Sequence, residues 1–180
     1  MTKLFLVLHV LAAIVAVGPV TVAASMFPRV LREALAAPGD ARPVTTLRTL
    51  HRICRVYGGL GIAVVVFGFA TASSMDVLGS VWLIVSIALT FLAAVILLVL
   101  LLPRQEEALA ALTAPAPAPA AGDVAGAGAA EAGGGAGGGV VVRPDARTSV
   151  LLGAYTGVFN VLWATVTVLM IVRPGSTTGA

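Results

Sequence analysis

Four long apolar runs constrain this chain more than any other feature of its sequence. They lie near 4–27, 56–73, 81–102 and 150–172, and none of them contains an acidic or basic side chain. Each is close to the roughly 20 residues that a helix needs to cross about 30 Å of hydrocarbon. Helices satisfy their own backbone hydrogen bonds, which lipid cannot do. The sequence therefore predicts an all-α fold, a transmembrane four-helix bundle.

The composition agrees with lipid as the main solvent. Hydrophobic residues make up 59% of the chain and charged residues 11%, whereas a soluble domain carries about 25% charged residues. The net charge is +3, but the basic residues flank the apolar runs and do not cluster with aromatic residues. We therefore expect the lipid bilayer as a partner and no nucleic acid. The single cysteine, Cys54, excludes an internal disulfide and is expected to be a small buried side chain.

The predicted organisation has three parts. Residues 1–113 carry the first three spans, together with an amphipathic helix at about 44–57 that lies on the membrane surface. Residues 114–140 form a linker rich in alanine, glycine and proline, which we expect to be disordered and cytoplasmic. Residues 141–180 carry the fourth span and a tail. The first run exceeds the roughly 7–15 apolar residues of a signal peptide, so we expect it to be retained.

Basic residues are distributed unequally between the two sides of the predicted bundle. The short connection near 74–80 has only Asp76, and the terminal segments contribute Lys3 and Arg173. Loops rich in lysine and arginine stay in the cytoplasm, so we expect both long connections to be cytoplasmic and both termini to be outside. The basic residues of the long connections are Arg29, Arg32, Arg42, Arg48, Arg52, Arg55, Arg104, Arg143 and Arg147.

The predicted surface helix at 44–57 has two distinct faces. Apolar residues recur at three- and four-residue steps from Val44 to Tyr57, while Arg48, Arg52 and Arg55 crowd another face. Such a helix buries its apolar side and attracts anionic headgroups. We interpret the three arginines as membrane-surface residues that fix the topology, with a specific lipid-binding site as the alternative.

Each apolar run also carries a stripe of small or polar residues at helical spacing. Membrane helices associate through such residues, so we expect the four stripes to face one another. His9, Gly68, Ser86 and Thr167 lie a similar number of residues from the outer ends of their runs. We therefore expect them at one depth in the membrane, in a single layer. The stripes are His9, Ala12, Ala13, Ala16 and Ala23; Gly58, Gly61, Val65, Gly68 and Ala72; Ser86, Thr90 and Ala93; and Gly153, Gly157, Asn160, Ala164 and Thr167.

His9 is the candidate functional residue, because ionisable groups inside a membrane are costly and often functional. It is either a ligand or proton-transfer group, or a packing histidine whose nitrogens bond Ser86 or Thr167. For Asn160 we predict a structural role. Pro19 cannot donate to the carbonyl of Val15, and the Asn160 amide is expected to do so instead. His51, in contrast, is expected at the membrane surface beside lipid headgroups.

The first run contains the segment LHVLAAI at 8–14, with Gly18 nine residues after the histidine and Pro28–Arg29 beyond. This pattern resembles a predicted bacterial four-helix integral membrane family of unknown function. It is distantly similar to the membrane protoporphyrinogen oxidases and to copper-resistance D-type membrane domains. The resemblance implies a bacterial cytoplasmic membrane location and a haem b contact at His9. Ser86 and Thr167 are the expected lining residues, because they fall in the same layer as His9.

The sequence departs from the oxidase pattern at two places, so the haem contact is expected here but the oxidase activity is not. In the oxidases an aromatic residue lies seven positions after the histidine, and the corresponding residue here is Ala16. The oxidases also carry a lysine in the third span, which the third run of this chain lacks. We therefore expect a non-enzymatic haem b-binding protein or an accessory subunit of a redox complex, without catalytic residues or a metal cluster. A homodimer would supply a second His9. The alternatives are a membrane oxidoreductase of haem synthesis and a purely structural helix-bundle subunit.

Overall fold

The computed structural model describes residues 2–114 and 145–174, and throughout these residues the regular structure is helical. The predicted all-α class is confirmed for this part of the chain. The linker after Ala114 and the tail lie outside the described residues. In chain order the elements are α1 (Thr2–Ala36), α2 (Ala41–Ser74), α3 (Val81–Val95), the π-helix η1 (Ile96–Leu101), α4 (Leu102–Thr113) and α5 (Ala146–Val172).

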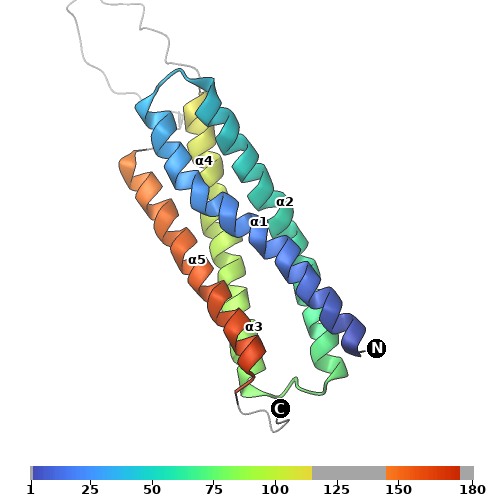
Figure 1. The fold of residues 1–180 in the computed structure, drawn as a ribbon. Helices are drawn as coiled ribbons and strands as arrows, with labels where there is room; N and C mark the ends of the chain where they lie inside the picture. The colour runs from blue at the N-terminus through green and yellow to red at the C-terminus, as the bar shows by residue number, and fades with distance from the viewer. Residues whose placement is uncertain (1, 115–144, 175–180) are drawn as a thin grey trace, which may run out of the picture.

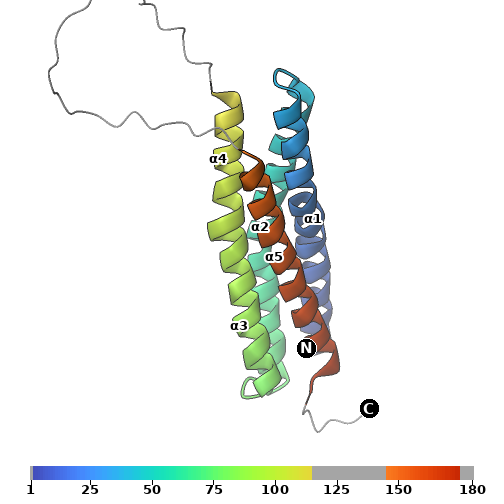
Figure 2. The same cartoon turned by 90° about the vertical axis from the view of Figure 1, so that its left-hand side faces the viewer.

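These elements form four long rods, because α3, η1 and α4 follow one another without a break (Figure 1). All four rods are long and apolar enough to cross a membrane. The start of α1 and the end of α5 lie at one end of the bundle, which we call the terminus end; it carries Lys3, Asp76 and Arg173. The turn between α1 and α2 and the end of α4 lie at the opposite end, seen from a second side in Figure 2. We call this the arginine end, because Arg29, Arg48 and Arg104 lie toward it.

α1 continues nine residues beyond its predicted end near residue 27, through Pro28 to Ala36. A proline inside a helix leaves the carbonyl four residues earlier without its donor. Here that carbonyl belongs to Ala24, and the Thr156 hydroxyl of α5 lies 3.4 Å from it and 2.8 Å from the carbonyl of Leu152. The Thr156 hydroxyl thus partly replaces the backbone N–H donor that is missing at Pro28, and the helix is not interrupted.

The separate surface helix predicted at 44–57 is wrong, since these residues are the first part of the single helix α2. Pro43 lies in the first turn of α2, where its missing N–H would have no helical partner anyway. The chain reverses just before, at 37–40, where Gly39 has a φ of 98°. Asp40 then caps α2 by accepting from the backbone N–H of Arg42 at 2.9 Å. The helix therefore begins at this reversal and runs on into the predicted second span.

The third rod extends beyond the span predicted at 81–102. The six residues of η1 are wound as a π-helix, and the N–H of Leu102 bonds the carbonyl of Leu97, five residues earlier. Pro103 follows directly and has no N–H for the carbonyl of Val99. The wider π turn accommodates the proline, and the rod continues through α4 to Thr113.

The apolar core is concentrated toward the arginine end. Its fully buried members include Phe27 and Leu31 of α1, Leu47 of α2 and Leu101 of η1. Toward the terminus end the buried cluster contains only Ala72, Trp82 and Leu83, with Val77 and Met170 packed against it. The bundle is therefore tightly filled at one end and joined by fewer contacts at the other.

Candidate functional site

His9 links α1 to α2 in the half of the bundle nearer the termini. Its Nδ1 lies 2.9 Å from the carbonyl oxygen of Val64, and its ring is partly buried. The ring packs directly on Gly68, where an added Cβ would lie 2.9 Å from the His9 Cε1. Only glycine leaves room for this imidazole. The predicted proximity of His9 and Gly68 is confirmed, and the pair fixes how the two helices approach each other.

This hydrogen bond also decides the chemistry of the ring. A carbonyl oxygen only accepts, so Nδ1 carries the proton and donates it to Val64, and Nε2 keeps its lone pair. A histidine held in this way through Nδ1 is oriented to coordinate a metal through Nε2. The arrangement therefore provides one nitrogen ligand whose direction is set by the contact between α1 and α2.

The two hydroxyl residues predicted to accompany His9 have other partners. The Ser86 hydroxyl is fully buried and donates to the carbonyl of Trp82 in its own helix at 2.8 Å. The Thr167 hydroxyl is exposed and donates to the carbonyl of Trp163 at 2.9 Å. Each hydroxyl thus bonds the carbonyl four residues earlier, a common arrangement in helices. The expectation that they satisfy the His9 nitrogens is wrong, since the backbone of Val64 takes that role.

Asn160 does not reach the carbonyl of Val15, so this expectation is also wrong. Its Nδ2 donates to the Ser25 hydroxyl at 3.2 Å, ten residues further along α1 than Val15. Its Oδ1 is buried and has no partner within the described part of the chain. Asn160 does join α5 to α1. The carbonyl that α5 does approach is that of Ala24, which Pro28 leaves without its helical donor.

The glycine stripe of α5 faces outward and not into the bundle as expected. Gly153 and Gly157 are exposed, and no neighbouring atom lies within 4 Å of the Cβ position at either. The buried face of α5 instead carries Leu152, Thr156 and Phe159. Larger side chains fill the space between α5 and its neighbours, which leaves the small residues on the outer surface. The prediction that four small-residue stripes meet therefore fails for this helix.

A buried polar cluster near the arginine end was missed by sequence reasoning. His51 is 9% exposed, and its Nδ1 lies 3.2 Å from Oε1 of Gln105, which is fully buried. The Gln105 Nε2 lies 3.9 Å from the Cys54 sulfur. The His51 Nε2 is buried and has no partner among the described residues. The expectation that His51 lies beside lipid headgroups is wrong, whereas the predicted burial of Cys54 is confirmed.

One sequence signal could have placed His51 inside the bundle. Helical residues four positions apart lie on the same face, and His51 follows Leu47 by four. It therefore belongs to the buried stripe that contains Leu47, Leu50 and Cys54. Nothing comparable identifies Gln105 as the partner, because α4 is brought to this position by the packing of distant segments.

The three predicted membrane-surface arginines lie on the exposed side of α2. Arg48 and Arg52 form no ion pair with any other described residue, while Arg55 lies 3.4 Å from Glu106 of α4. Arg104 lies over the ring of Tyr155, 5.1 Å from its centroid. Arg55 and Arg104 thus connect the rods at the arginine end, and Arg48 and Arg52 are free to meet other charged groups.

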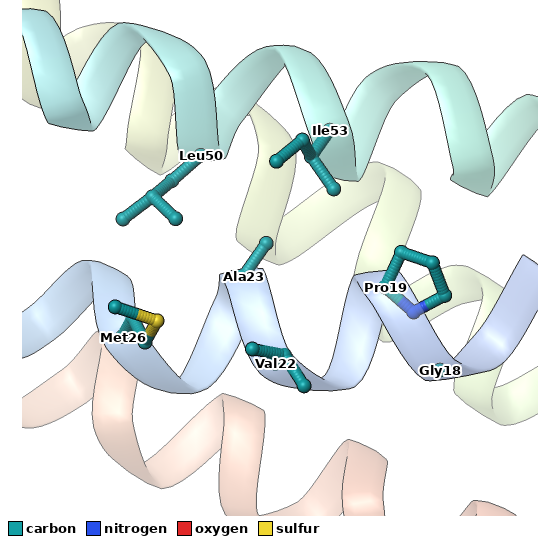
Figure 3. Close-up of a pocket in the computed structure, with 7 residues that line it drawn as sticks. All are labelled: Gly18, Pro19, Val22, Ala23, Met26, Leu50 and Ile53. Atoms are coloured by element: carbon teal, nitrogen blue, oxygen red, sulfur yellow. The ribbon is translucent and has the colours of Figure 1, made fainter.

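A groove opens between α1 and α2 beside Pro19, with a volume of about 360 Å³. Figure 3 shows Leu50 and Ile53 of α2 on one side and Gly18, Pro19 and Met26 of α1 on the other. Gly18 contributes no side chain, and Ala23, which is buried, contributes only a methyl group. The hollow exists because small residues of α1 oppose larger ones of α2, and its walls are apolar.

His9 provides a nitrogen ligand but lies outside this groove. A second hollow borders Gly39, Arg48 and Leu112 at the arginine end, and it too is remote from His9. Because His9 is only partly buried, a haem held by it would lie at the surface of the bundle and need cover from a second molecule. No family model, curated protein or solved structure matches this chain, so the resemblance of the first helix to haem-associated families stays a prediction.

Proposed function

We propose that this chain is inserted in a bacterial cytoplasmic membrane with both termini outside. The unequal distribution of charge supports this orientation, because Arg29, Arg48 and Arg104 belong to the end opposite the termini. In α2, the charge-free stretch between Arg55 and Asp76 measures about 31 Å at 1.5 Å per residue. This is close to the roughly 30 Å of a bilayer's hydrocarbon layer.

Within that membrane, the proposed role is that of a non-enzymatic haem b-binding protein or redox-complex accessory subunit, with His9 as the axial ligand. The observation that carries this proposal is the 2.9 Å bond from the His9 Nδ1 to the Val64 carbonyl. It leaves Nε2 as the coordinating atom and fixes the plane of the ring. Bound haem would give the protein an electron-carrying group, while this chain supplies the ligand and the apolar surroundings.

The second ligand is proposed to be His9 of a second copy. The only other histidine, His51, is buried near the arginine end. His9 is partly exposed, and its helix carries exposed apolar residues such as Val7 and Val10 beside it. A symmetric pair would place two such faces on either side of one macrocycle, since a two-fold interface uses the same patch on both subunits.

Visible spectroscopy of the detergent-purified protein tests the proposal. The wild type with added haemin is expected to show a Soret band at a stoichiometry of one haem per two chains. His9→Ala should lose the band, while His51→Ala should keep it, since His51 faces the interior near the arginine end. A wild type without the band, or a His9→Ala variant that retains it, would refute the haem function.

A further inference from the structure

We propose that Arg48 and Arg52 of α2 together bind the phosphate of an anionic phospholipid headgroup at the arginine end of the bundle. The proposal rests on the membrane position given above, with Arg55 at the edge of the hydrocarbon layer, and does not depend on haem. Three properties of the two arginines support it: their depth, their common face, and their lack of a counter-ion among the described residues.

The depth of the two arginines corresponds to the headgroup layer. Arg52 lies three residues beyond Arg55 and Arg48 lies seven, or about 4.5 and 10 Å along the helix. Polar headgroups add roughly 5–8 Å on each side of the hydrocarbon, and a phosphate held between the two guanidinium groups lies about 7 Å beyond Arg55. Arg42 is also exposed, but it lies thirteen residues, or about 20 Å, beyond Arg55 and is too far from the membrane to take part.

Arg48 and Arg52 lie one turn apart on one face of α2. Residues four positions apart in a helix are neighbours on its surface, with their Cβ atoms about 5–6 Å apart. Both residues are exposed, so their guanidinium groups can converge on one phosphate. A guanidinium donates paired N–H bonds to phosphate oxygens, and such charge-assisted bonds are about twice as strong as neutral ones.

Neither arginine forms an ion pair with another residue in 2–114 or 145–174. The nearest arginine on this side of α2, Arg55, does have a partner, since it lies 3.4 Å from Glu106 of α4. Two like charges four residues apart destabilise a helix slightly. A phosphate bound between Arg48 and Arg52 removes this repulsion, so the pair is expected to attract an anion.

The surface next to the pair favours a lipid over a soluble anion. Toward the membrane the exposed side of α2 becomes apolar: Val56, four residues after Arg52, is 58% exposed, and Leu60 is 42% exposed. Anionic lipids are concentrated at the cytoplasmic surface, and basic residues there attract them, each by about fivefold. The site is therefore expected to prefer phosphatidylglycerol to phosphatidylcholine, because the choline group adds a positive charge beside the arginines.

Native mass spectrometry of the full chain, released from mild detergent with equal amounts of these two lipids, tests the site. The wild type should retain phosphatidylglycerol in preference to phosphatidylcholine. Arg48→Gln and Arg52→Gln should each lower this preference about fivefold, and the double variant should abolish it. Arg42→Gln is the matched control, because it removes the same charge from the same helix outside the headgroup layer. Equal retention of both lipids by the wild type, or an equal loss in Arg42→Gln, overturns the site.

Competition with glycerol phosphate separates a lipid from a soluble anion. This compound carries the phosphate but no acyl chains, so an excess of it should leave the retained phosphatidylglycerol in place. Displacement of the lipid would identify a soluble anion as the ligand and overturn the lipid proposal.

Flotation with phospholipid vesicles distinguishes this proposal from the two on which the function rests. The wild type and the double variant should both float, because the apolar rods hold the protein in the bilayer. A wild type that does not float would refute the membrane position as well, whereas flotation with equal retention of the two lipids refutes the headgroup site alone. His9→Ala should keep the lipid preference, so a failure of the haem proposal leaves this one intact.

Discussion

The two ends of the bundle are held together in different ways. Toward the arginine end, large side chains such as Phe27, Leu31 and Leu47 are completely buried in one continuous core. In the other half, α1 and α2 are joined by the His9 bond to Val64 and by the fit of its ring on Gly68. Packing distributes stability over many residues, whereas a polar bond depends on two. Removal of one large core side chain is therefore expected to cost more stability than disruption of the single contact at His9.

The largest effect is expected from emptying the core near the arginine end. Phe27→Ala removes a ring that is 0% exposed, and large-to-small changes of this kind cost about 3–5 kcal/mol. Phe91→Ala is the control, because Phe91 is 70% exposed on the outer surface. Denaturant unfolding in detergent micelles should show a large loss of stability for the first variant only. Equal losses for both would mean that the core does not stabilise this end.

A smaller loss is expected at the buried polar cluster. Gln105→Leu leaves both nitrogens of His51 without a partner, and an unsatisfied buried polar group costs about 1–3 kcal/mol. Replacing both partners with apolar residues avoids that penalty. The double variant His51→Leu/Gln105→Leu should therefore recover most of the stability in the same unfolding measurement. If it is less stable than Gln105→Leu alone, the bond between the two side chains is not what matters.

Gly68→Ala tests the other half of the comparison. The added Cβ would meet the His9 ring at 2.9 Å, displace it, and weaken its bond to Val64, at an expected cost of about 1 kcal/mol. Gly59→Ala has no such neighbour and should be neutral or slightly stabilising, because alanine favours helices. In a double-mutant cycle, Gly68→Ala should cost little once His9 is alanine. Additive effects would indicate that the ring does not require this glycine.

The smallest effect concerns the first turn of α5, outside both halves of the core. The backbone N–H of Thr148, 2.9 Å away, lowers the pKa of the Asp145 carboxyl below its ordinary value of 3.8. Stabilisation by this cap is complete above the ordinary pKa and is lost as the pH falls through the lowered one. The protection factor of the Thr148 amide hydrogen, its exchange rate relative to that of an unstructured peptide at the same pH, should therefore fall in acid. Asp145→Asn keeps a cap but should remove this pH dependence.

The sequence by itself determined that this is an all-helical chain with four rods able to span a membrane. The physical reason is local: each apolar run is long enough to span the hydrocarbon layer and contains no acidic or basic side chain. The same local logic placed His9 near Gly68, since both were counted from the ends of their runs. The burial of Cys54 was predicted because a single cysteine has no disulfide partner and is expected to be a small buried side chain.

Only the tertiary structure decided which polar groups meet. The first span was expected to end near residue 27, yet α1 continues through Pro28, and the Thr156 hydroxyl of α5 approaches the carbonyl that this proline leaves without a helical donor. Gln105 could be paired with His51 only once α4 was placed against α2, since 54 residues separate the two. α5 buries its larger side chains and turns its glycines outward. The larger side chains are needed there because the packing of all four rods sets the width of the space that α5 has to fill. Such pairings depend on distances between helices, and these distances are not encoded in the periodicity of any one of them.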